Sequence, residues 1–161
     1  MKCNVAMILG SGLGDFVNNL KDPAVILYKD IPNWKTGKGV CGHKSRLVIG
    51  CLKSNENSWM VIMQGRLHIY EGHKVAEVCF PVRVFHQLKI KNLILTCATG
   101  SLNPEYRCGD IILVKDHINQ LGVNPLIGTP FKPLFVDMKD CYNEEYRMKF
   151  MGLAHKHKIK I

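Results

Sequence analysis

The sequence predicts an α/β fold with a mixed, twisted sheet flanked by helices. Three observations lead to this prediction. An apolar run near the N-terminus is typical of a buried strand, two apolar runs around a polar turn are typical of a hairpin, and apolar residues three and four positions apart are typical of a helix. The 161 residues are 47% apolar and 22% charged, which excludes a disordered chain and allows one hydrophobic core.

The first elements follow one another as strand, loop and helix. Residues 3–9 form the apolar strand, which runs into Gly-Ser-Gly, and residues 13–20 are long enough for a short helix. A hairpin comes next, with strands at residues 47–52 and 59–64 joined by the polar turn 54–57. The order therefore predicts a sheet that begins with a buried strand.

A longer helix is predicted at the middle of the chain. Its apolar face is made by Val75, Val78, Val82, Phe85 and Leu88. Pro81 either kinks this helix or lies in its first turn. Two strands are then predicted, at residues 92–98 and 111–114, and a last helix at residues 143–158.

Charge and cysteine content narrow the class of protein. Lys and Arg number 22 against 13 acidic residues, a net charge of +9, so an anionic small molecule or a nucleic acid must be considered as ligand. No basic stripe interleaved with aromatic residues runs along a predicted strand, which makes nucleic acid the less favoured ligand. The seven cysteines are odd in number and none forms a C-x-x-C pair, so we expect reduced thiols and a cytoplasmic protein.

Neither a membrane role nor a metal site is expected. No uninterrupted apolar stretch approaches the roughly 18 residues that a membrane-spanning helix needs. Asp110, Asp116 and His117 lack the spacing of a metal triad, and no His-Glu-x-x-His or EF-hand motif occurs. We found no internal repeat or linker, so residues 1–161 are predicted to be one domain or one portion of a domain.

A glycine-rich turn directly follows the first predicted strand. In residues 10–14, Gly-Ser-Gly-Leu-Gly, successive backbone N–H groups can form an anion nest, and Ser11 adds a hydroxyl donor. The turn lacks the Gly-Lys-Ser/Thr ending of a P-loop and the glycine spacing of a dinucleotide fingerprint. Phosphate is the ligand this turn suits, although a glycine-rich turn can also serve chain geometry alone.

A second polar run follows the hairpin. If residues 64–72 are extended, Arg66, His68 and Tyr70 project to one face about 7 Å apart. The fork of an arginine holds phosphate in bidentate fashion, whereas His and Tyr offer single bonds suited to a sugar hydroxyl. Glu71 is placed to orient His68. The alternative is a solvated strand face with an incidental alternation.

Two further loops carry weaker signals. His43 lies in a polar, glycine-flanked segment, where a titratable side chain on a mobile loop and a merely solvated histidine are both consistent with the sequence. Ala98 follows the strand predicted at residues 92–98, within a small-residue turn at the place where ligands bind in open α/β sheets. On its own, this segment predicts only a turn.

Taken in order, these motifs resemble the trimeric purine nucleoside phosphorylases. The resemblance covers nearly the whole chain and rests on residues 8–14, 31–33, 42–48, 63–72, 80–86 and 109–119. Its most specific part is Gln64-Gly-Arg-x-His-x-Tyr-Glu-Gly72. The resemblance implies the nucleoside phosphorylase fold, in part, and identifies the chain as the N-terminal portion of one such domain. The chain ends at Ile161, little more than halfway through a family subunit.

The resemblance implies a role for each motif residue. Phosphate would be bound by Ser11, Arg66 and His68, with His43 on a nearby mobile loop. Glu71 would support His68, and these two are the expected catalytic pair.

Three more residues are assigned by the same resemblance. Tyr70 would pack on the ribose and Ala98 would border the purine. Phe135 matches an aromatic that such enzymes lend to the site of a neighbouring subunit, which implies a homotrimer.

The implied activity is that of a transferase, specifically a glycosyltransferase of purine salvage. It would catalyse the reversible phosphorolysis of purine ribonucleosides or deoxyribonucleosides to a free base and ribose or deoxyribose 1-phosphate. Inorganic phosphate would be the co-substrate, with no metal or organic cofactor. The alternatives are a non-catalytic family member that binds phosphate or associates with intact subunits, and a basic module that binds nucleic acid.

Overall fold

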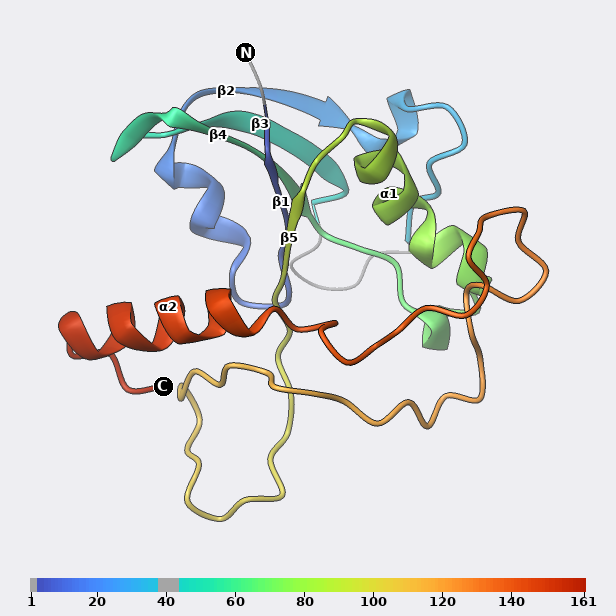
Figure 1. The fold of residues 1–161 in the computed structure, drawn as a ribbon. Helices are drawn as coiled ribbons and strands as arrows, with labels where there is room; N and C mark the ends of the chain where they lie inside the picture. The colour runs from blue at the N-terminus through green and yellow to red at the C-terminus, as the bar shows by residue number, and fades with distance from the viewer. Residues whose placement is uncertain (1–2, 38–43) are drawn as a thin grey trace. The chain divides into compact units, whose positions relative to one another are not determined.

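The computed structural model describes residues 3–37 and 44–161, which divide into two units, one up to Thr99 and one from Gly100. The first unit contains a five-stranded sheet in the order β2-β3-β4-β1-β5. The strands are β1 (Val5–Ile8), β2 (Leu20–Leu27), β3 (Arg46–Leu52), β4 (Asn55–Gln64) and β5 (Asn92–Leu95). Figure 1 shows β1 and β5 running side by side through this unit.

The sheet is mixed, as the sequence predicted. β1 pairs in parallel with both β4 and β5, whereas β2, β3 and β4 pair antiparallel. A strand between two parallel neighbours is covered on both faces, which explains why β1 and the residues that follow it are a continuous apolar run. Ala6, Ile8 and Leu9 are all buried.

Each face of the sheet carries its own apolar cluster. On one face, Phe85 packs with Ala6, Ile8, Tyr28, Trp34, Leu47, Val61 and Met63. On the other face, Val17 packs with Leu9, Leu20, Val48, Met60 and Ile62. Because successive strand residues point to opposite faces, the alternation in β4 supplies both clusters and fixes its register.

Helices cover these two faces. Phe85 belongs to α1 (Val75–Gln87) and Val17 to η1 (Gly14–Asn19), a short 3-10 helix. Two further 3-10 turns are η2 (Tyr28–Asp30) and η3 (Ile69–Glu71). The predicted helices at residues 13–20 and 75–88 are therefore present, and Pro81 lies inside α1 rather than in its first turn.

Three strand predictions need correction. The hairpin turn lies at residues 53–54, so β4 begins at Asn55 and includes most of the turn predicted at residues 54–57. β2 was not expected, because Asp22 and Pro23 interrupt its apolar pattern; the structure accommodates them at a shift in the β2–β3 register between Lys21 and Ala24. Proline is tolerated on an edge strand with such an irregularity. Conversely, residues 111–114 form no strand in the described chain, because no neighbouring strand pairs with them.

The second unit is mostly turns, followed by α2 (Glu144–Lys156). This helix confirms the prediction for residues 143–158. The Asn143 side chain accepts a hydrogen bond from the Tyr146 amide at 2.8 Å, so it caps the N-terminus. Two acidic residues in the first turn and two basic residues in the last turn complement the helix dipole.

Candidate functional site

Three parallel strands bring their carboxyl ends to one end of the sheet. β1 pairs Ile8 with Met63 of β4 and with Leu95 of β5. The segments that follow these strands, residues 9–14, 65–72 and 96–98, therefore start side by side. We call them together the three-loop site. In open α/β sheets, ligands bind outside the carboxyl ends of the strands.

The first loop is a tight turn that exposes Ser11. The Leu13 amide donates to the Gly10 carbonyl at 3.3 Å, and Gly12 has a φ of +85°, which side-chain-bearing residues rarely adopt. Ser11 is exposed at the corner of the turn. The turn thus presents a hydroxyl at the end of the sheet, as the sequence predicted.

The third loop approaches the backbone of Gly10 so closely that a side chain there would collide with it. A Cβ built on Gly10 lies 2.6 Å from the Thr96 carbonyl oxygen and 2.8 Å from the Cys97 Cα. The Gly10 amide donates a hydrogen bond to Thr96 Oγ1 at 2.8 Å. The same hydroxyl donates to the Ile8 carbonyl oxygen at 3.3 Å. Thr96 therefore joins the loops after β1 and β5.

Arg66 connects the second loop to the same residue. Its Nη1 donates to the Thr96 carbonyl oxygen at 2.7 Å. The preceding Gly65 has a φ of +111°, and its carbonyl accepts a hydrogen bond from the buried Tyr28 hydroxyl at 2.7 Å. The Arg66 guanidinium is thus held against the third loop, and the backbone just before Arg66 is held by Tyr28.

His68 and Glu71 form the hydrogen-bonded pair that the sequence predicted. Glu71 Oε2 lies 3.0 Å from His68 Nδ1 and accepts the His68 amide at 2.8 Å. The side chains are 18% and 10% exposed. A carboxylate at Nδ1 favours a proton on that atom, so the opposite ring nitrogen, Nε2, is the one that can serve a ligand.

Burial raises the pKa of the Glu71 carboxyl, but the neighbouring groups together lower this pKa by more. The hydrogen bonds from the ring and amide of His68, with the electrostatic attraction of His68 and His73, lower the pKa of Glu71 from its usual 4.5. Gly37 lies directly against this carboxylate, since a Cβ added to Gly37 would be 3.1 Å from Glu71 Oε1. Glu71 is therefore a carboxylate that holds the His68 ring in a fixed orientation.

Residues 64–72 are not extended throughout, so the condition for a row of side chains about 7 Å apart is not met. β4 ends at Gln64, and η3 turns the chain at residues 69–71. As a result the His68 and Tyr70 rings stack, with centroids 4.7 Å apart and planes at 17°, instead of standing about 7 Å apart along a strand. Gly72, with a φ of +87°, ends the turn. The alternation in the sequence could not reveal this turn.

The remaining predicted residues lie in different places. Ala98 is exposed in the third loop. Phe135 belongs to the second unit and is 94% exposed. His43 lies outside the described residues. The structure thus brings Ser11, Arg66, His68, Glu71, Tyr70 and Ala98 to the three loops of the first unit.

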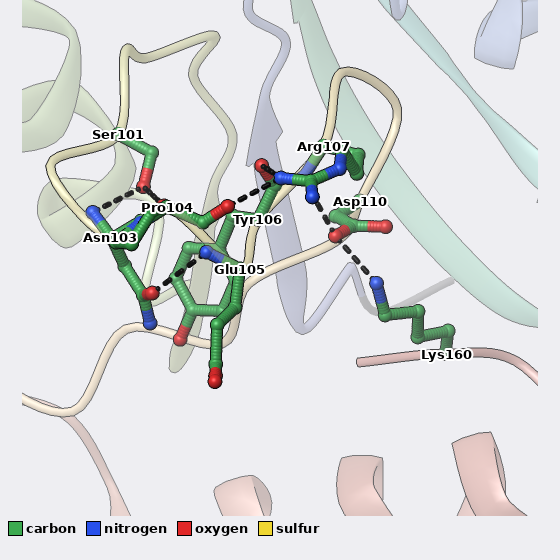
Figure 2. A network of polar contacts seen from close by, with 8 residues as sticks. All are labelled: Ser101, Asn103, Pro104, Glu105, Tyr106, Arg107, Asp110 and Lys160. Atoms are coloured by element: carbon green, nitrogen blue, oxygen red, sulfur yellow. Dashed lines mark hydrogen bonds and ion pairs between the residues drawn. The ribbon is translucent and has the colours of Figure 1, made fainter.

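The second unit contains a polar network around Asp110. Asp110 Oδ2 accepts from Lys160 Nζ at 2.7 Å and from the Arg107 amide at 3.0 Å, and these bonds lower the pKa of Asp110 (Figure 2). Arg107 also donates to the carbonyls of Pro104 and Tyr106. The network thus links Lys160 to the turn at residues 107–110.

The fold and the site define a class: an α/β protein with polar loops gathered at the carboxyl ends of parallel strands. A family model described as "Phosphorylase superfamily" matches residues 4–161. The chain therefore belongs to the phosphorylase superfamily. Among the described residues, neither α-helix has the length and apolar character needed to cross a membrane.

Comparison with individual proteins agrees with this family. The chain is 44% identical over 151 residues to purine nucleoside phosphorylase of Mus musculus, covering 90% of this chain and 51% of that protein. It is 42% identical over 144 residues to purine nucleoside phosphorylase 1 of Bacillus subtilis, covering 88% of this chain and 52% of that one. The chain spans about half the length of the curated relatives it matches.

Solved structures give the same result. Schistosoma mansoni purine nucleoside phosphorylase in complex with adenosine superposes with a TM-score of 0.85 at 33% identity, covering 98% of this chain and 56% of that one. Isoform 2 of the enzyme from the same organism, in complex with cytosine and ribose 1-phosphate, also has a TM-score of 0.85, at 31% identity.

Proposed function

We propose that this chain functions in the phosphorolysis of purine nucleosides, yielding a free purine base and a pentose 1-phosphate. The observation that carries the proposal is the convergence of the Ser11 turn, Arg66 and the His68–Glu71 pair at one end of the sheet. The relatives named purine nucleoside phosphorylase support it. Phosphate is the co-substrate, and the reaction needs no metal or organic cofactor.

Ser11, Arg66 and His68 bind the phosphate in this proposal, with His43 as a further contact. Arginine offers a two-pronged, charge-assisted contact, and serine and histidine add directional bonds. A phosphate oxygen attacks C1′ of the sugar while the bond from C1′ to the base nitrogen breaks. The base leaves with the bonding electrons and takes up a proton. The developing positive charge on the sugar is opposed by the phosphate.

Tyr70 and Ala98 contact the nucleoside in the same proposal. Tyr70 is 77% exposed and stacked on His68, so its ring is presented beside the group proposed to hold phosphate. This position suits packing against the ribose. Ala98 is small and exposed in the neighbouring loop, where a flat purine can approach.

We also propose a homotrimer in the cytoplasm, with Phe135 contributing to a neighbouring subunit. The 94% exposure of Phe135 favours a contact outside its own chain. The cysteines support the location, since all six described ones are free thiols. The same exposed ring favours one alternative function, a non-catalytic member that associates with intact subunits.

Binding of ribose 1-phosphate tests the proposed function directly. This product carries the phosphate and sugar that the three-loop site is proposed to hold. We expect binding in a titration followed by 31P NMR, tighter than that of inorganic phosphate because Tyr70 adds a sugar contact. Ribose 5-phosphate serves as the control, since it presents the same groups in another geometry. Equal affinity for the two sugar phosphates would contradict the proposal.

A further inference from the structure

Gln64 is the one polar residue fully buried in the described core, with an exposure of 0%. It is the last residue of β4 and lies directly opposite Arg46, the first residue of β3. Its amide is satisfied at both atoms. Oε1 accepts from Arg46 Nε at 2.6 Å, and Nε2 donates to the Gly14 carbonyl at 2.7 Å.

The chemistry of its partners allows only one orientation of this amide. A guanidinium N–H can only donate, so it must meet the amide oxygen. A backbone carbonyl can only accept, so it must meet the amide nitrogen. The charged donor polarises the amide and strengthens the second hydrogen bond. Arg46 therefore determines how Gln64 presents its N–H group to Gly14.

This chain of bonds links separate parts of the three-loop site. Gly14 ends the glycine-rich turn that carries Ser11 and begins η1. Gln64 precedes Arg66 by two residues, across Gly65. One buried amide thus connects the turn with the segment that carries the guanidinium, and Thr96 connects the same two parts from the other side.

We propose that Gln64, oriented by Arg46, is a positioning residue that sets the placement of the Ser11 turn relative to Arg66. The inference deepens the proposed function, on which it rests: the site binds phosphate only when Ser11 and Arg66 are held at a fixed separation. Gln64 does not touch the phosphate itself. Its side chain points into the sheet interior toward Gly14, and it acts through the turn.

Gln64→Glu is the principal test variant. The carboxylate keeps the size of the side chain and the bond to Arg46, but it has no donor for the Gly14 carbonyl and repels that oxygen. Gln64→Met is a second variant of similar size that loses both bonds. Gln120→Glu is the matched control, because it makes the same chemical change at an exposed position of the second unit.

Two measurements are made on each variant of the 161-residue chain, at a temperature where circular dichroism shows it folded. Amide hydrogen exchange of Leu13, which donates to Gly10, reports the turn, and Val61, in β4, reports the sheet. We expect exchange at Leu13 to rise about tenfold in Gln64→Glu, the effect of losing about one hydrogen bond. Val61 and the control variant should be unchanged.

Phosphate affinity is the second measurement, by titration with inorganic phosphate. We expect the Kd to rise about tenfold in Gln64→Glu and Gln64→Met and to stay constant in Gln120→Glu. An unchanged Leu13 exchange rate in both Gln64 variants would overturn the positioning role, as would an unchanged Kd. If the unmodified chain binds no phosphate, the proposed function fails, and the Leu13 exchange rate alone decides the positioning role.

Discussion

Arg66 is the residue on which the phosphate proposal most depends. Its guanidinium lies in the three-loop site, where it donates a hydrogen bond to the Thr96 carbonyl. In Arg66→Ala we expect phosphate binding to weaken by about 1.5–3 kcal/mol. The free energy of unfolding should fall by no more than about 1.5 kcal/mol, because a half-buried polar side chain is removed and no cavity forms in the core.

Calorimetric titration with phosphate measures the first quantity and urea unfolding the second. Lys53→Ala removes an equal charge at the opposite end of β4 and is the control. Phosphate affinity that is equally reduced in both variants would show a general effect of charge instead of a contact at Arg66.

Glu71 gives a prediction about pH. Its folded-state pKa lies below the usual value of 4.5, so the His68–Glu71 pair contributes stability that is fully present above pH 4.5. This contribution is lost as pH falls through the lower, folded-state pKa. Glu71→Gln lacks the ionisable group, so the difference in unfolding free energy between the chain and this variant should shrink as pH falls below about 4.5.

Urea unfolding at a series of pH values measures that difference. Asp116→Asn, which changes an exposed acid of the second unit, shows what an unrelated carboxylate contributes. A difference that stays constant from neutral pH to pH 3 would mean that Glu71 is not ionised next to His68.

The residue types of the site were predictable, whereas their contacts were not. The motif from Gln64 to Gly72 contains the catalytic candidates by residue type, and the structure confirms the contact between His68 and Glu71. The bond from Arg66 to Thr96 joins residues 30 positions apart, and a backbone carbonyl acceptor leaves no mark on the sequence. The sequence signal for Gln64 is an amide side chain at the end of the apolar run of β4.

At the scale of elements, the close contact of the β1 and β5 ends is the feature that builds the site. Gly10→Ala places a Cβ 2.6 Å from the Thr96 carbonyl oxygen, and both nearest neighbours are backbone atoms that cannot rotate away. We expect a loss of about 1–3 kcal/mol in unfolding free energy, as for other overpacked positions.

Gly152→Ala is the natural comparison for this variant. Gly152 is exposed inside α2, and a Cβ there meets nothing within 4 Å. Alanine should therefore stabilise α2 by about 0.5–1 kcal/mol. Thermal unfolding of both variants is the measurement. Unfolding temperatures that shift in the same direction in both variants would contradict the account of the Gly10 contact.

The elements that sequence patterns predicted well are those with a strong period or a continuous apolar run. β1, the β3–β4 hairpin, α1 and α2 are of this kind. β2 was missed because Asp22 and Pro23 break its pattern, and its tertiary pairing with β3 overrides that local signal. Residues 111–114 show the converse, since β-branched residues form a strand only beside a partner.

At the scale of the whole molecule, the proposed homotrimer gives a prediction about Phe135. Phe135 is 94% exposed and belongs to the second unit. If it lends its ring to a neighbouring subunit, Phe135→Asp should shift the chain toward a monomer in sedimentation velocity, because a desolvated carboxylate is costly at an interface. Lys139→Asp, also exposed in this unit, controls for added negative charge.

An unchanged oligomer in Phe135→Asp would remove Phe135 from the interface and, with it, the assignment of this residue to a neighbouring site. A monomer in the unmodified chain at micromolar concentration would count against the trimer itself. Neither result bears on the three-loop site of a single chain.

Release of hypoxanthine from inosine, with and without phosphate, tests the central claim most directly. Our account predicts that release depends on phosphate, that ribose 1-phosphate forms in equal amount, and that Arg66→Ala suppresses both products. Lys53→Ala should retain them. Hypoxanthine release at the same rate without phosphate, with free ribose as the product, would contradict phosphorolysis. Absence of any release from folded protein would contradict catalysis by this chain.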